Sequence, residues 1–163
     1  MLDIIKSRRS VRSFQDTPVE EEKIIQLIDC ARLAPSARNL QPWKFVVVTD
    51  RETLDTLSNL LDTGRFVSEA ALCIAVFCQD TKYFLEDGCA ATMNILLAAE
   101  ALGLGTCWIA GDKKTYREDV EKLLGAPENC RLVSLIAAGY PKGSPAVKQK
   151  KKLEEVICRE RYQ

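Results

Sequence analysis

The stretch SRRSVRSF, residues 7–14, brings together Arg8, Arg9, Ser10 and Arg12. Each guanidinium presents a planar fork of N–H donors that matches phosphate oxygens, and a serine hydroxyl can add a further hydrogen bond. The cluster could therefore bind a doubly negative group. It could equally be a charged turn exposed to solvent, which is the common state of such runs.

A second basic segment, KQKKK, lies near the other end of the chain at residues 148–152. Lys148 and Lys150 alternate, so in an extended segment they point to the same side. Alone, this run is typical of a flexible, solubilising terminus. The whole chain, however, has 23 basic and 23 acidic residues and a formal net charge of zero. Two basic clusters at opposite ends of a neutral chain favour the two halves of one anion site.

Two further stretches combine polar side chains with glycine or proline. PSARNLQPW contains Pro35, Ser36 and Asn39, and its amide side chains can recognise the edge of a polar heterocycle. The alternative is a helix-to-strand connection with a core tryptophan. GLGTCWIAG, residues 103–111, is not a dinucleotide fingerprint, because its first glycines follow a helix and are expected to end it. Gly111 could instead allow a flat ring to approach bare backbone.

Composition excludes several kinds of chemistry. The chain has no histidine, so Ser-His-Asp and Cys-His mechanisms and histidine-containing zinc sites are excluded. The seven cysteines show no C-x-x-C spacing and lie mostly among apolar residues, which predicts reduced thiols in a cytoplasm and no metal site. Neutrality argues against nucleic-acid binding, and no apolar run is long enough to cross a membrane. Difficult chemistry would therefore belong to a bound cofactor.

The pattern of apolar residues predicts one α/β or α+β domain over residues 1–163. Helices are expected at about 2–6, 17–34, 51–61, 83–102 and 115–124, and strands at 43–49, 70–78, 103–111 and 132–139. Thr17, Asp50 and Thr115 are the expected N-terminal caps. The small residues on one face of the 83–102 helix indicate close approach of another helix, in this chain or a partner. Residues 140–163 have little to bury, which favours an extension that docks on a partner subunit.

Four stretches in this order, RRSVRSF, APSARNLQPWKF, GLGTCWIAG and GYPKG…KQKKKLEEVICRERY, resemble the nitroreductase family over nearly the whole chain. The resemblance implies an α+β fold: a central, mostly antiparallel sheet flanked by helices, in an intertwined homodimer with two FMN sites at the subunit interface. It also implies hydride transfer from NADH or NADPH through FMN to a nitroaromatic, quinone or similar small-molecule acceptor. No dedicated catalytic side chain is expected.

The resemblance further implies which residues hold FMN. They come from four places in the sequence: Arg8, Arg9, Ser10 and Arg12; Pro35, Ser36 and Asn39 from the other subunit; Ala110 and Gly111 beside the ring; and Lys148 and Lys150 at the phosphate. The chain departs from the family where some members carry an acidic residue in place of Ala110 and where arginine often replaces the tail lysines. It also lacks the insertions that cover the flavin in many members.

Three other functions stay open from the sequence. A specialised flavin reductase or dehydrogenase, for dehalogenation or azoline oxidation, is the main alternative within the enzyme class. A flavin-binding redox module without turnover would give its cysteines a role. A structural interaction protein would use the alanine-rich helix as its contact face.

Overall fold

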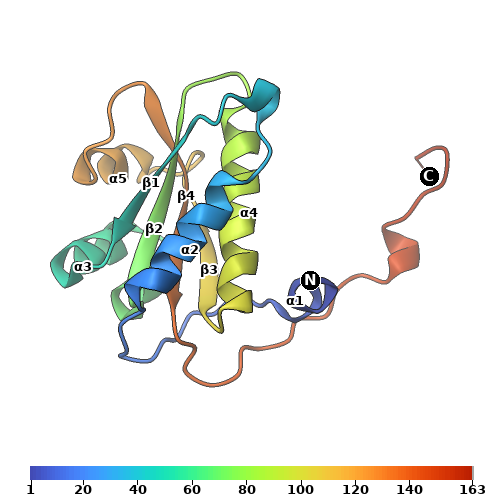
Figure 1. Cartoon of the computed structure of the whole chain (residues 1–163), viewed down its shortest axis with the longest axis horizontal. Helices are drawn as coiled ribbons and strands as arrows, with labels where there is room; N and C mark the ends of the chain where they lie inside the picture. Colours follow the sequence, from blue (N-terminus) through green and yellow to red (C-terminus); the bar gives the residue numbers. More distant parts are fainter. Residues whose placement is uncertain (163) are drawn as a thin grey trace.

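A four-stranded antiparallel sheet forms the centre of the computed structural model, which describes residues 1–162 (Figure 1). The strands are β1 (Trp43–Val48), β2 (Leu72–Gln79), β3 (Gly105–Ala110) and β4 (Cys130–Gly139), and neighbours pair in the order β1-β2-β4-β3. The two central strands, β2 and β4, are apolar and buried along nearly their whole length, because helices cover both faces of the sheet. The strand β3 is left at an edge.

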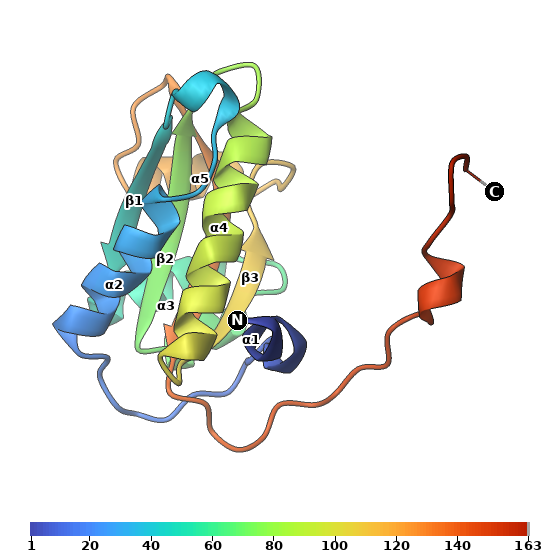
Figure 2. The same cartoon turned by 45° about the vertical axis from the view of Figure 1, so that its right-hand side comes forward.

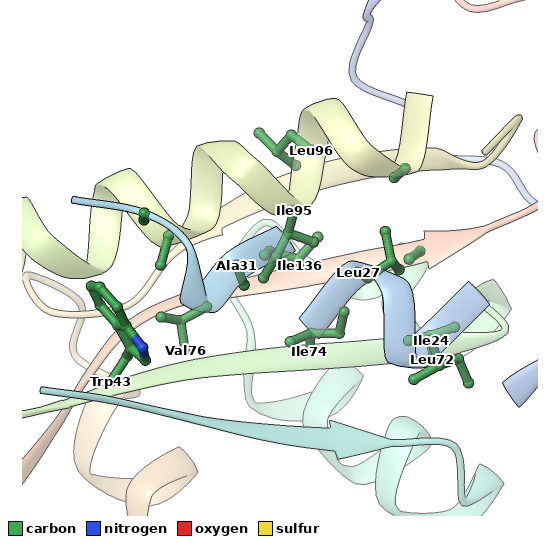
Figure 3. Packing of buried hydrophobic residues seen from close by; sticks show 14 of the residues in the cluster. Ile24, Leu27, Ala31, Trp43, Leu72, Ile74, Val76, Ile95, Leu96 and Ile136 are labelled. Atoms are coloured by element: carbon green, nitrogen blue, oxygen red, sulfur yellow. The ribbon is translucent and has the colours of Figure 1, made fainter. Parts of the chain in front are cut away.

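Helices pack on the two faces of this sheet: α2 (Glu21–Arg32), α3 (Arg51–Leu60), α4 (Phe84–Ala101) and α5 (Arg117–Leu123). A short helix, α1 (Leu2–Ser7), has no buried residue and lies beside the C-terminal end of α4. Figure 2 shows α2 and α4 side by side on one face, with α3 and α5 behind the sheet. Between α2, α4 and the sheet, Leu27, Ile74, Ile95 and Ile136 have no exposed surface and meet in one apolar cluster (Figure 3). The α+β architecture expected from the sequence is confirmed.

Part of the small-residue face of α4 packs against α2 of the same chain. Ala91 is completely buried, whereas Ala90, Leu97 and Ala98 are half-buried and Ala101 is exposed. The Asn94 side-chain amide donates to the backbone oxygen of Cys30, at 2.9 Å, where α2 lies closest. Small side chains let the two helices approach, and the asparagine satisfies a carbonyl near the end of α2. Of the two alternatives left open by the sequence, a helix of the same chain accounts for the part of this face at Ala91 and Asn94, and the rest of the face stays open to a partner.

Two of the three expected helix caps are wrong. Asp50 does cap α3, since its carboxylate accepts from the backbone N–H of Thr53 at 2.9 Å. However, α2 begins at Glu21 rather than after Thr17, because Val19 is buried in the core and keeps the preceding residues extended. Similarly, α5 begins at Arg117, after the buried Tyr116. Burial of an apolar side chain prevails over the capping pattern at both places.

Residues 141–162 leave the sheet as an extended segment that runs away from the body of the chain (Figure 2). Every side chain from residue 146 to 162 is exposed, and one short 3-10 turn, Leu153–Glu155, interrupts the segment. Val147 and Leu153 are 77% and 66% exposed, so the described part of this chain gives these apolar side chains no cover. Among the described residues, no helix is both long enough and apolar enough to span a membrane.

Candidate functional site

The arginine cluster is anchored to the edge strand β3 by its apolar neighbour. Val11 is buried, and its backbone N–H donates to the carbonyl of Thr106 at 2.8 Å. Gly105 makes this approach possible, because a Cβ there would lie 2.7 Å from the Val11 side chain. With Val11 pointing inward, the flanking Ser10 and Arg12 are left exposed. Gly105 is thus a packing requirement, whereas Gly103, with a φ of 74°, ends α4 as the sequence predicted.

Both basic segments of the sequence line one pocket of about 430 Å³. Its walls are residues 8–13 on one side and the start of the tail on the other, and its cationic side chains are those of Arg8, Arg9, Arg12, Lys142, Lys148 and Lys150. No carboxylate is among the described residues that line it. The structure therefore brings together the two clusters from opposite ends of the chain. An opening of this size and charge suits a small, strongly anionic ligand.

The arginines of this pocket differ in their present contacts. Arg9 donates to the carbonyls of Lys6, Ser7 and Arg8 at 2.7–2.9 Å, so its guanidinium caps the C-terminal end of α1. Arg12 lies over the ring of Phe66, with 5.9 Å from its guanidinium carbon to the ring centroid. Arg8 and Arg12 are consequently better placed than Arg9 to give their N–H donors to a ligand.

Burial keeps three thiols of the sheet protonated at neutral pH, and one of them, Cys107, lies near the arginines of the pocket. Burial raises the pKa of Cys107, although the neighbouring Arg12 and Arg8 oppose this shift. Burial also raises the pKa of Cys73 and of Cys78 to about 12. A thiol that stays protonated is a poor nucleophile and a poor metal ligand. The chemistry available at the pocket is therefore anion binding by arginine and lysine.

At the other end of β3, Ala110 and Gly111 play different parts. The Gly111 N–H donates inward to the carbonyl of Val133 at 3.1 Å, and a Cβ on Gly111 would lie 2.9 Å from that carbonyl oxygen. Packing against β4 thus accounts for the glycine. Because backbone groups of successive strand residues point to opposite sides, the Ala110 N–H faces the free edge of β3. The Tyr116 hydroxyl donates to the Ala110 carbonyl at 2.5 Å and fixes this turn.

The loop of Pro35, Ser36 and Asn39 is held by a buried carboxylate of α4. The backbone N–H of Ala37 donates to Asp87 Oδ1 at 2.9 Å, and Asp87 is only 4% exposed. Within the loop, Ser36 Oγ accepts from a backbone N–H at 2.9 Å. Three of its residues have positive φ: Arg38 at 53°, Asn39 at 57° and Gln41 at 49°. These left-handed residues make a tight, defined loop rather than a loose connection.

This loop and the arginine cluster lie at opposite ends of α4 (Figure 1). The loop is attached to the N-terminal end through Asp87, whereas Ser7, just before the cluster, donates to Glu100 Oε1 at 2.6 Å near the C-terminal end. At the helical rise per residue, the thirteen residues from Asp87 to Glu100 span about 20 Å. The structure does not bring the loop of this chain to the cationic pocket of the same chain.

Three residues that position the site were not singled out from the sequence. Lys142 lines the cationic pocket, and its presence in the motif GYPKG was an available signal. Asp87 anchors the 35–39 loop, and a carboxylate in the first turn of an otherwise apolar helix could have pointed to it. Tyr116 holds the Ala110 turn through its hydroxyl, which no local pattern reveals.

Comparison with known proteins places these observations in a family. The model of the nitroreductase family matches residues 5–75 and 78–140. A protein of Archaeoglobus fulgidus named as an NADH dehydrogenase/NAD(P)H nitroreductase is 40% identical over 149 residues, which cover 86% of this chain and 85% of that protein. A solved structure of the same name from Bacteroides thetaiotaomicron has a TM-score of 0.93 at 36% identity and covers 98% of this chain and 97% of its own. A structure titled FMN-dependent nitroreductase, from Clostridium difficile, has a TM-score of 0.91 at 29% identity, covering 99% of this chain and all (100%) of its own.

Proposed function

Because the chain belongs to the nitroreductase family, we propose that it is an FMN-dependent oxidoreductase that uses NADH or NADPH to reduce a small acceptor such as a nitroaromatic or a quinone. The observation that carries this proposal is the cationic pocket, in which both ends of a neutral chain place arginines and lysines without a carboxylate. Such a donor set fits the phosphate of FMN and has no other evident purpose in the fold.

The residues of the pocket would hold the phosphate end of FMN. Arg8 and Arg12 offer planar forks, Lys148 and Lys150 offer point charges from the tail, and Ser10 offers a hydroxyl. Arg9 belongs to the same wall, and its contacts with α1 give it the further task of fixing the backbone of the cluster. These side chains bind and orient the cofactor.

The edge of β3 leads from the pocket toward the position proposed for the ring. The outward N–H of Ala110 is a hydrogen-bond donor at that edge, and Gly111 sets the turn through its close packing on β4. When bound, FMN supplies the chemistry, taking a hydride from the nicotinamide and passing electrons to the acceptor. The protein contributes orientation and a backbone donor, which is consistent with a chain that contains no histidine.

A second copy of the chain would complete the site. Pro35, Ser36 and Asn39 lie about 20 Å along α4 from the pocket of their own chain, which supports a contribution to the site of a partner instead. The extended tail, with its exposed apolar side chains, is the segment that would dock on that partner. We therefore propose a homodimer with two equivalent FMN sites, each built from both copies.

The test is direct. Purified protein, or apoprotein supplied with FMN, should carry the visible absorbance of oxidised flavin at one FMN per chain. Stopped-flow mixing with NADH or NADPH under anaerobic conditions should bleach this absorbance, and an acceptor should restore it. Protein that takes up no FMN would contradict the proposal, and bound FMN that neither nicotinamide bleaches would favour a binding module instead.

A panel of acceptor compounds would identify the class of acceptor. Nitroaromatics, quinones, free flavins and a halogenated phenol, each assayed with both nicotinamides, separate a broad reductase from a specialised one. A broad reductase should turn over several acceptor classes with kcat/KM values of similar size. A dehalogenase would show one preferred halogenated substrate.

A further inference from the structure

Arg38 and Lys82 are two cationic side chains that line one small pocket of about 130 Å³ beside the 35–39 loop. Within residues 1–162, neither takes part in a salt bridge. The remaining walls of this pocket come from Ala37, Leu40, Thr81 and Tyr83. It lies at the N-terminal end of α4, and it shares no lining residue with the FMN phosphate pocket.

The backbone presents Arg38 in a fixed direction. Its φ of 53° lies in the left-handed region, which residues other than glycine adopt only where the surroundings hold them there. The restraints come from both sides: Asp87 accepts the N–H of Ala37, and the N–H of Asn39 donates to Ser36 O at 3.0 Å. Arg38 thus stands between two residues proposed to contact FMN in the partner subunit.

The opposite wall offers a second charge and an unused hydroxyl. Lys82 Nζ lies 5.2 Å from the ring centroid of Tyr83, which keeps the stem of this lysine against the aromatic side chain. Thr81 Oγ1 is buried and has no hydrogen-bond partner among the described residues. Buried hydroxyls normally have a partner, and this one would gain a partner from a ligand once the Thr81 side chain turns toward the pocket that the residue lines.

We propose that Arg38 and Lys82 bind the anionic group of a substrate and thereby determine which substrates of the flavin reaction are preferred. Two cations beside a hydroxyl, over a small apolar floor, match a compact phosphate or carboxylate. This inference rests on the proposed function, because the 35–39 loop brings Arg38 to the reaction only if it reaches the FMN of the partner. Phosphate groups of the nicotinamide donor and a carboxylate on the acceptor are the two sources of such a group.

The experiment compares substrates that differ only in charge. Arg38→Gln and Lys82→Met remove the charge while keeping a long side chain, Arg38→Lys keeps it, and Lys122→Gln on α5 is the matched control for net charge. The donors are NADPH and NADH, the acceptors are 4-nitrobenzoate and the neutral 4-nitrobenzyl alcohol, and inorganic phosphate is the competitor. FMN content and dimerisation are measured on every variant.

In the charge-removing variants, kcat/KM for the anionic substrate should fall about tenfold or more, the size of one charged hydrogen bond, mainly through KM. If kcat/KM falls for NADPH alone, the bound group is the 2′-phosphate; if it falls equally for both nicotinamides, the group is their shared pyrophosphate. If kcat/KM falls for 4-nitrobenzoate alone, the bound group is the carboxylate of the acceptor. Inhibition by phosphate should weaken in parallel, and Arg38→Lys should recover part of the loss.

The inference is overturned if kcat/KM for each of the four substrates stays within about twofold of its wild-type value in the FMN-loaded, dimeric variants Arg38→Gln and Lys82→Met. It is also overturned if Lys122→Gln produces the same change, because the effect would then come from net charge. Failure of the proposed function would look different, since the wild-type protein itself would then bind no FMN or show no reduction of it.

Discussion

The two ends of α4 carry two structurally different candidate binding regions. At its C-terminal end, three arginines, two of them half-buried, and an extended tail form an open, cationic pocket. At its N-terminal end, a buried carboxylate holds a tight loop of left-handed residues. One end has charge and little fixed packing, whereas the other has fixed packing and presents its polar groups outward.

The contrast supports the proposal that a second copy completes each site. Anion binding does not require a closely packed tail, because charges act over distance. Orientation of a flat ring requires a loop whose backbone is already fixed. The fold places these two features about 20 Å apart, at the ends of one helix, and in the proposed homodimer each FMN would meet one of them from each copy.

Removal of residues 148–163 should produce the largest effect, at the cationic pocket beside the C-terminal end of α4. The truncation deletes Lys148 and Lys150 together with the exposed apolar side chains of the tail. We expect FMN affinity to fall by about 3 kcal/mol or more, as two charged contacts are lost, and the dimer to weaken with it. Flavin absorbance after gel filtration and sedimentation velocity measure the two properties.

A full-length control separates charge from docking. Lys148→Met with Lys150→Met should lose FMN affinity but keep the dimer, because the apolar tail is intact. A truncated protein that stays dimeric and fully loaded with FMN would show that the tail belongs to neither the pocket nor the interface.

At the same end, Arg8→Ala and Arg12→Ala should each weaken FMN binding by about 1.5–3 kcal/mol, the range for a lost charged hydrogen bond. Arg9→Ala should act mainly on α1, since its guanidinium is bonded to three carbonyls there. Titration of apoprotein with FMN gives the affinities, and amide exchange of residues 2–8 reports on α1. Equal losses of FMN affinity in all three variants would contradict this division of roles.

At the N-terminal end of α4, Asp87→Ala should lower the free energy of unfolding by about 1–3 kcal/mol, because it leaves the Ala37 N–H without its partner. The loop should then exchange its amide protons faster, and FMN affinity should fall through a change of loop geometry. Asp87→Asn keeps an acceptor oxygen and is the matched control. If Asp87→Ala leaves the exchange of residues 37–41 unchanged, the carboxylate does not hold the loop.

Away from both ends of α4, Asp50→Ala removes the cap of α3 and should have the smallest effect on stability and none on FMN binding. Hydrogen bonds from the Thr53 side chain and then its backbone N–H lower the pKa of Asp50. A lowered pKa in the folded state means that the stabilisation is present at neutral pH and is lost as pH falls through the folded value, below about 4. Thermal unfolding should show a small deficit at pH 7 that disappears in acid, with FMN binding unchanged throughout.

The sequence predicts the elements of this fold better than their exact beginnings. Apolar runs identified β1, β2 and β4, and a short glycine-punctuated segment identified β3; helical spacing identified α2 and α4, and expected caps pointed to α3 and α5. Caps were predicted from Thr17 and Thr115, but burial of Val19 and Tyr116 decides where the helices begin. A capping pattern describes a few neighbouring residues, whereas these side chains are fixed by contacts with the rest of the chain.

For the candidate site, the residue types and the meeting of the two basic segments could be predicted from the sequence. Charge balance pointed to a meeting of the arginine cluster with Lys148 and Lys150, and the pocket contains both. The inward direction of the Gly111 N–H depends on strand register, and the Asp87 contact depends on where α4 begins, so neither follows from local pattern.

The central claim is that each FMN site is built from two copies, and mixing defective copies tests it most directly. One chain carries Arg8→Ala and Arg12→Ala, and the other carries Ser36→Ala and Asn39→Gly, where glycine tolerates the positive φ. The two are unfolded together, refolded at equal amounts, and their FMN content is compared with that of each variant refolded alone.

Random pairing makes half of the dimers mixed, and each mixed dimer contains one site with both defects and one with none. The account predicts that high-affinity FMN binding returns at roughly a quarter of all sites. FMN binding that stays at the level of the separate variants, in a mixture shown to contain mixed dimers, would contradict a shared site and place the whole FMN site within one chain.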